Sequence, residues 1–102
     1  MELKPVHNTN GREPLKVGWL IRYDGDIYKA MLVDDSRAYC VKLSTIAKKV
    51  FTSKAEELSF AQNISSQYTI SISPCSQVDV YGVHRSNIDK EILKRREQNG
   101  SK

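Results

Sequence analysis

The sequence has few of the residues on which metal and redox sites depend. Its 102 residues include two cysteines, Cys40 and Cys75, and two histidines, His7 and His84, and these four residues are scattered along the chain. A structural zinc site needs four such ligands at close spacing, so we expect no metal. Two cysteines without a secretion signal are more typical of reduced, packed thiols than of a disulfide, which is the alternative.

Long apolar runs are also missing. No segment approaches the roughly 20 consecutive apolar residues that a membrane helix requires. The first five residues, Met1-Glu2-Leu3-Lys4-Pro5, do not begin an apolar signal region. We therefore expect an intracellular protein, cytoplasmic or nuclear, that does not engage a membrane.

Patterns typical of catalysis are equally sparse. The five glycines are isolated, which excludes a Gly-rich phosphate loop. The adjacent carboxylates of Asp34 and Asp35 are explained by a hairpin turn. His84 would be a base for Ser86 or Cys75 only if the fold brought them together. We expect no enzyme and no cofactor; a small nuclease with dispersed acidic and basic residues is the remaining enzymatic alternative.

What is present fits one small domain. The apolar fraction of 39% is enough for a single core of modest stability. Residues 1–14 lack hydrophobic periodicity and predict a flexible lead-in. Residues 15–98 predict one β-rich domain that ends in a helix, and residues 99–102 predict a tail.

The stretch from residue 16 to residue 43 predicts a three-stranded antiparallel meander. Asp24-Gly25 between two alternating runs is a strong hairpin signal, and Asp35-Ser36 marks a second turn. In this register Ile21 lies opposite Tyr28, and Lys29 lies opposite Lys42 on the other face, near water. One face of the sheet then collects the apolar and aromatic side chains: Val17, Trp19, Ile21, Tyr23, Tyr28, Ala30, Leu32, Tyr39, Val41 and Leu43.

The second half of the chain predicts two helices and two further strands. Ser53 followed by Glu56 is a capping-box pattern. Acidic residues after Ser86 and basic residues further on are typical of a helix. The expected elements are a helix over 54–61, strands over 68–73 and 77–83, and a C-terminal helix after Ser86; Ile46, Val50 and Phe51 fit either a strand or an earlier helical turn. The fold class is mainly β (α+β): a small five-stranded antiparallel barrel or a strongly bent sheet, with a short middle helix and a C-terminal helix.

The aromatic residues of the meander are candidates for binding a partner. Tyr23, Tyr28 and Tyr39 lie together in the predicted register. Aromatic side chains on a small sheet can enclose a cation through cation–π contacts, although packing in a core is the alternative. The sequence therefore favours a non-enzymatic module that binds a protein partner at these residues, as a regulatory or adaptor subunit.

The meander also resembles the first half of a Tudor domain. The resemblance lies in Val17-Gly18, Tyr23-Asp24-Gly25, Tyr28-Lys29-Ala30 and the return strand Tyr39-Cys40-Val41-Lys42-Leu43. It implies an SH3-like barrel that reads methylated arginine or lysine, or that binds an unmodified protein segment. The family has Asp-Tyr-Gly after the third strand, where this chain has Ser44-Thr45-Ile46.

Binding of nucleic acid is the alternative function. From Arg85 onward the chain carries net charge +3 of its total of +4. A basic segment beside sheet aromatics can bind phosphate and stack bases, although cations at a helix end also complement the helix dipole. The residues that would contact nucleic acid are Lys48, Lys49, Arg85, Lys94, Arg95 and Arg96.

Overall fold

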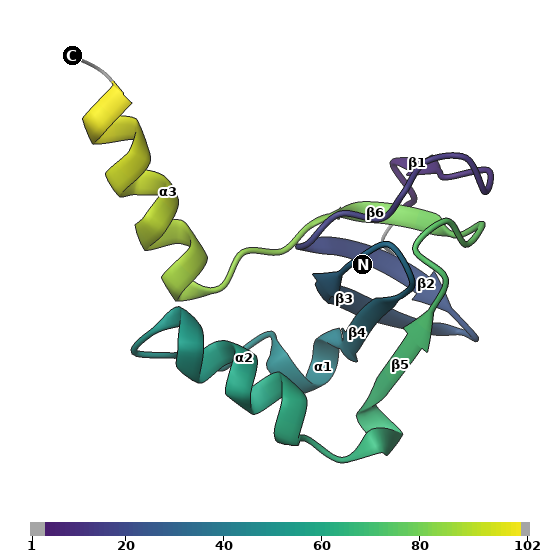
Figure 1. Ribbon diagram of the computed structural model, residues 1–102, viewed down its shortest axis with the longest axis horizontal. Coiled ribbons are helices and arrows are strands. Elements are labelled where there is room, and N and C mark those ends of the chain that lie inside the picture. Colours follow the sequence, from purple (N-terminus) through teal and green to yellow (C-terminus); the bar gives the residue numbers. More distant parts are fainter. Residues whose placement is uncertain (1–3, 101–102) are drawn as a thin grey trace.

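The computed structural model describes residues 4–100, which form one six-stranded antiparallel sheet and three helices (Figure 1). The strand order is β1-β6-β2-β3-β4-β5, so that β1 and β5 are the two edges and the sheet is open rather than a closed barrel. The fold class is therefore confirmed as mainly β (α+β), in the form of a bent sheet. The strands are β1 His7–Asn8, β2 Trp19–Tyr23, β3 Asp26–Val33, β4 Ala38–Lys42, β5 Thr69–Ile72 and β6 Asp79–Val83; the helices are α1 Leu43–Ile46, α2 Lys54–Asn63 and α3 Asn87–Gly100, with a single 3-10 turn at Ser66–Tyr68. No helix within residues 4–100 has the length and apolar character needed to span a bilayer.

The first hairpin has the predicted register. Asp24 and Gly25 both have positive φ, at 50° and 86°, as the two central residues of a type I′ turn require. Ile21 pairs with Tyr28 and Tyr23 with Asp26. The two turn residues thus set which side chains of β2 and β3 share a face.

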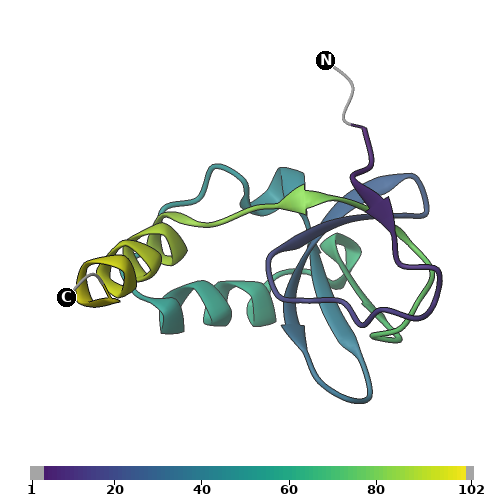
Figure 2. The same ribbon diagram turned by 90° about the horizontal axis from the view of Figure 1, so that it is seen from above.

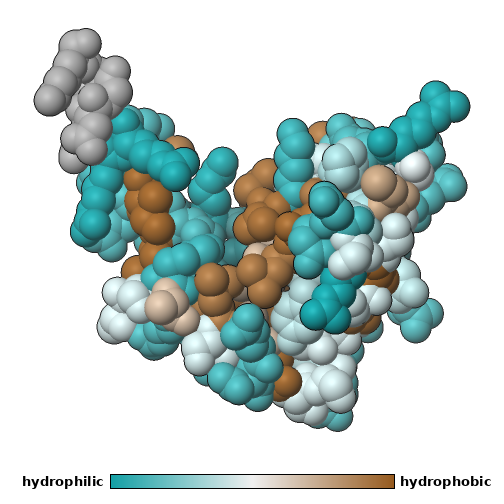
Figure 3. All heavy atoms as spheres, viewed as in Figure 1, coloured by the Kyte–Doolittle hydropathy of each residue, from teal (hydrophilic) through white to brown (hydrophobic). Residues whose placement is uncertain are grey.

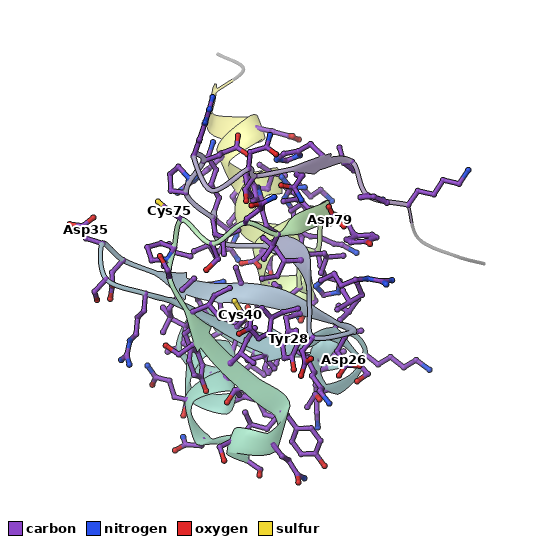
Figure 4. The ribbon with its side chains drawn as sticks, turned by 90° about the vertical axis from the view of Figure 1, so that its right-hand side faces the viewer. Asp26, Tyr28, Asp35, Cys40, Cys75 and Asp79 are labelled. Atoms are coloured by element: carbon purple, nitrogen blue, oxygen red, sulfur yellow. The ribbon has the colours of Figure 1, made fainter. Side chains whose placement is uncertain are left out.

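The second hairpin departs from the predicted register after its first pairs. Leu32 faces Tyr39 as expected, and the turn is held by Asp34, whose carboxylate accepts bonds from the backbone of Ser36 and Arg37. These bonds lower the pKa of Asp34, because they favour its charged form. Figure 4 shows Asp35 at the outer tip of this loop.

A β-bulge between Ala30 and Leu32 then shifts the pairing by one residue. Ala30 pairs with Cys40 rather than Val41, and Lys29 pairs with Val41 rather than Lys42. A one-residue shift moves every later side chain to the opposite face. Tyr39 and Val41 therefore lie on the face opposite Tyr28, which corrects the predicted single aromatic face.

The described part of the predicted lead-in, residues 4–14, takes part in the sheet. His7 pairs with Val80 of β6, which makes β1 the sixth strand. Thr9 is buried, and its hydroxyl donates to the carbonyl of Ser76 and accepts from the amide of Val78. Because these bonds satisfy backbone groups of a distant loop, this polar segment has an ordered conformation without any hydrophobic periodicity.

The sheet has a separate core on each face. The inner core lies within the bend of the sheet, and the helix-side core lies beneath α1, α2 and the first turns of α3; Figure 2 shows α2 and α3 on the same side of the sheet. The buried residues of the inner core are Leu15, Ile21, Tyr28, Ala30, Ala38, Cys40, Val78 and Val80. Those of the helix-side core are Met31, Val41, Ile46, Phe51, Ala61 and Ile88.

Helices α2 and α3 begin where the sequence predicts, and α1 occupies part of the stretch for which a strand and a helical turn were both open. The hydroxyl of Ser53 accepts a bond from the amide of Glu56 at the start of α2, and the hydroxyl of Ser86 accepts one from the amide of Asp89 at the start of α3. In α2 the fully buried positions are Glu57 and Ala61, one turn apart, whereas Leu58 is half-buried. A glutamate thus faces the sheet.

Candidate functional site

A hollow lies between α3 and the adjoining part of the sheet. It has a volume of about 380 Å³, and the space-filling view shows it as a notch with apolar surface on both sides (Figure 3). We call it the α3 cleft. The residues that line it are Val17, Gly18, Lys54, Val83, His84, Arg85, Asp89, Ile92, Leu93 and Arg96.

One wall of the α3 cleft is a face of α3. Asp89, Ile92, Leu93 and Arg96 follow the spacing i, i+3, i+4, i+7, which places them on one side of a helix. Ile92 packs partly against the helix-side core, whereas Leu93 is 39% exposed. The wall therefore runs from a charged base through an apolar middle to a basic end.

The other wall comes from the entry to β2 and the end of β6. Val17 and Val83 are 52% and 48% exposed, which is high for apolar side chains. Between them the backbone of Gly18 donates to the carbonyl of Ala30 and accepts from the amide of His84. Gly18 has φ of +95°, and a Cβ there would lie 3.3 Å from a methyl carbon of Val83. The backbone conformation therefore favours glycine, and a side chain there would also force Val83 to shift by a few tenths of an ångström.

A group of four charged side chains lies beneath the α3 cleft, and we call it the buried ion cluster: Lys29, Lys54, Glu57 and Asp89. Lys29 and Glu57 are 1% and 0% exposed. The Lys29 ammonium lies 3.5 Å from Glu57 Oε2 and 3.7 Å from Asp89 Oδ2. Lys54 completes the group at 2.7 Å from Asp89 and 3.4 Å from Glu57. The two cations and two carboxylates compensate one another, as buried charges must.

The pKa shifts of Lys54 and Asp89, the two more exposed members of the cluster, agree with both side chains being charged. Burial raises the pKa of Asp89, but the hydrogen bond from Lys54 and the charges of Lys54 and Lys29 outweigh burial, so the pKa is below its ordinary value. Burial lowers the pKa of Lys54, but the bond to Asp89 and the neighbouring carboxylates raise it above its ordinary value. Both groups are therefore ionised at neutral pH.

Polar contacts fasten the first turn of α3 to the rest of the molecule. The Ser86 hydroxyl donates to Glu57 at 2.8 Å. The Asn87 side chain accepts from the amide of Phe51 at 2.9 Å and donates to the carbonyl of the same residue at 2.7 Å. The base of α3 is thus fixed, whereas its outer half extends away from the sheet (Figure 1).

His84 lines the α3 cleft as a neutral side chain. Burial, and then the charges of Lys29 and Lys90, lower its pKa, while the Ala47 carbonyl and Glu57 act in the opposite sense. The hydroxyl of Ser86 is bonded to Glu57 rather than to His84. The neighbourhood therefore lacks the base–nucleophile contact that covalent catalysis uses.

The structure does not gather the three tyrosines predicted to bind a partner. Tyr28 is buried in the inner core beside Cys40 (Figure 4), and Tyr23 is 40% exposed next to the first turn. Tyr39 is on the helix side, where its hydroxyl donates to the carbonyl of Ala61 at 2.7 Å. The three side chains have three different surroundings and do not line one open concavity.

The six residues predicted to contact nucleic acid also lie in different parts of the surface. Arg85 and Arg96 line the α3 cleft. Lys49 lies over the ring of Phe60 in a separate hollow, and Arg95 is paired with Glu91 at 2.7 Å. Lys48 and Lys94 are exposed.

The cysteines are free thiols in different environments. Cys40 is fully buried in the inner core, and burial raises its pKa to about 12. Cys75 is exposed in the loop before β6 (Figure 4). Within residues 4–100 no group of three or more His, Cys, Asp or Glu side chains is arranged to hold a metal ion.

The buried ion cluster was not predicted from the sequence. Lys29 alternates with Tyr28 and Ala30 and was expected near water, since its expected neighbour was Lys42. Its partners come from α2 and α3, and only the three-dimensional structure brings them together. The capping-box residue Ser53 was the one local signal, because it fixes the start of α2 and so the face on which Glu57 lies.

Comparison of the chain with protein-family models, with curated proteins and with solved structures found no match. What the site can do therefore follows from its own geometry. It offers an apolar surface flanked by cations, which is suited to binding.

Proposed function

We propose that this protein is a non-enzymatic interaction module that binds a protein partner in the α3 cleft. One observation carries the proposal: of the eight large apolar side chains exposed in the described part of the chain, three line this single hollow. They are Val17, Val83 and Leu93. Exposed apolar side chains that gather in a concave site are typical of interaction surfaces, whereas scattered ones need no explanation.

The lining of the α3 cleft favours protein over nucleic acid. It contains no Phe, Tyr or Trp, the large aromatic side chains on which bases stack; its one aromatic ring is the half-buried imidazole of His84. Four of its ten residues are apolar, and these side chains would make no favourable contact with a charged phosphate backbone. An aliphatic or aromatic side chain of a partner, by contrast, would lose its contact with water between Leu93 and Val83. Of the two protein-binding roles implied by the Tudor resemblance, the α3 cleft suits an unmodified segment.

The test begins with selection of short peptides from an unbiased displayed library on the wild-type protein. The selected peptides are then measured against Val83→Asp and Leu93→Asp, with Val50→Asp as the matched control, because Val50 is 78% exposed and borders another hollow. We expect both cleft variants to weaken binding by at least about tenfold and the control to bind like wild type. Peptides that lose affinity for Val50→Asp but not for the cleft variants would overturn the proposal.

Val83→Asp, together with a further variant, Lys94→Glu, separates protein binding from the nucleic-acid alternative. We expect no shift of DNA or RNA in a mobility assay at low salt. A shift that Lys94→Glu abolishes and Val83→Asp leaves unchanged would instead support the alternative function and count against the cleft.

A further inference from the structure

We infer that the segment bound in the α3 cleft is acidic and carries a single apolar anchor residue. This inference rests on the proposed function and names the class of partner. It depends on which charges at the rim remain available after the internal ion pairs have formed.

Two cations of the rim have no internal partner. Within residues 4–97, no carboxylate lies within 4.0 Å of Arg85 or Arg96. Both side chains are exposed and both line the α3 cleft. Arginine is the side chain best suited to bind a carboxylate through two hydrogen bonds.

The other titratable groups of the α3 cleft are either compensated by an ion pair or neutral. Asp89 is held by Lys54 at 2.7 Å and also faces Lys29, so its charge is compensated and repels an incoming carboxylate little. His84 is neutral, because its pKa is lowered. The lining therefore has a net positive charge that comes from Arg85 and Arg96.

The apolar part of the α3 cleft sets the second requirement. Val17 and Val83 face Leu93 across a hollow of about 380 Å³. This volume is near the lower end of the roughly 300–1,000 Å³ of pockets that take small ligands. One large apolar side chain, rather than an apolar helix face, is the appropriate occupant.

A second copy of this chain is a poor occupant. Its own projecting element, α3, carries four cations (Lys90, Lys94, Arg95 and Arg96) against three carboxylates (Asp89, Glu91 and Glu97), so its net charge of +1 has the same sign as the rim. The whole chain also has a net charge of +4. Like charges brought together in an interface oppose association, so the partner is a different, acidic protein.

The first experiment measures the composition of the peptides selected above. We expect enrichment of Asp and Glu around one Leu, Ile, Phe or Trp. A matched set of synthetic peptides then varies one feature at a time: acidic flanks with Leu, Lys flanks with Leu, and acidic flanks with Ala. The peptide with acidic flanks and Leu is expected to bind at least about tenfold more tightly than either of the others.

The second experiment reverses the charge at the rim of the α3 cleft. Arg85→Glu combined with Arg96→Glu should abolish the preference for acidic flanks and create one for Lys flanks; both side chains are exposed, so the fold is retained. Lys48→Glu combined with Lys94→Glu is the control with the same change in net charge, and it should keep the acidic preference. Added salt should weaken wild-type binding.

The possible failures are distinguishable. Neutral or basic peptides that still lose affinity for Val83→Asp would overturn this inference and leave the proposed function standing. Peptides indifferent to Val83→Asp and Leu93→Asp would overturn the proposed function itself. Concentration-dependent self-association that Val83→Asp abolishes would replace the acidic partner with a second copy.

Discussion

The two faces of the sheet each cover a buried core, but the side chains of the two cores differ in chemical character. The inner core consists of apolar side chains such as Ile21, Ala30 and Cys40, which are all completely buried. The opposite face also buries Met31 and Val41, but it places Lys29 among them and compensates its charge through α2 and α3. The inner core is thus built from apolar and aromatic side chains, and the opposite face includes the buried ion cluster.

The buried ion cluster explains how a small domain can hold a projecting helix in a fixed direction. Apolar contacts are not directional, whereas a buried cation tolerates only arrangements that keep its carboxylates close. The carboxylates of Glu57 and Asp89 belong to α2 and α3, so Lys29 connects the sheet to both helices. The helix that this cluster holds is the one that forms a wall of the α3 cleft.

The largest effect is expected from breaking the buried ion cluster. Glu57→Ala leaves the buried Lys29 ammonium with only Asp89, at 3.7 Å, and also removes the bond from Ser86. We expect a loss of about 3–5 kcal/mol in the free energy of unfolding, measured by urea denaturation.

The double variant Lys29→Met with Glu57→Leu is the control for this prediction. It should be considerably more stable than Glu57→Ala, because it leaves no unpaired charge inside the protein. Equal stability of the two variants would show that the cluster acts through packing alone.

Removing side-chain volume from the inner core should lower the free energy of unfolding. Ile21→Ala is expected to cost about 2–5 kcal/mol, because it removes methyl groups from a fully buried site. Labelling of the Cys40 thiol should accelerate in parallel, while the exposed Cys75 reacts rapidly in both proteins. Unchanged protection of Cys40 would contradict the assignment of both residues to one core.

A smaller and more local effect is expected at the base of α3. Asn87→Ala removes both side-chain bonds to the backbone of Phe51 and should cost about 1–3 kcal/mol. Amide hydrogen exchange should accelerate in α3 and stay nearly constant in β3. If β3 and α3 accelerated equally, the two faces would form one cooperative unit rather than two.

The smallest expected effect is the contribution of His84 to the pH dependence of the free energy of unfolding. The pKa of His84 is lowered in the folded state, so the unfolded chain binds a proton more readily. His84 should therefore reduce stability as the pH falls below about 6.5, the unfolded value, and should leave it unchanged above that pH. The stability difference between wild type and His84→Gln, followed from pH 7.5 to pH 5 (roughly the range over which histidine titrates), should show this slope. A flat difference would contradict the environment described for this side chain.

Local signals predicted the parts of the fold that local physics decides. Asp24-Gly25 predicted the first hairpin because type I′ turns require positive φ, and Ser53 and Ser86 predicted helix starts because their hydroxyls satisfy free amides. The bulge after Ala30 and the burial of Lys29 could not be predicted, because they depend on residues distant in the sequence. The α3 cleft was missed for the same reason: Val17 and Leu93 meet only in the folded chain.

Titration with the selected peptide, monitored by NMR of the methyl groups, shows whether the peptide binds in the α3 cleft. We expect the resonances of Val17, Val83 and Leu93 to shift together, while those of the more exposed Val6 and Val50 stay in place. Shifts confined to Val6 or Val50, with the three cleft residues unchanged, would contradict binding in the α3 cleft.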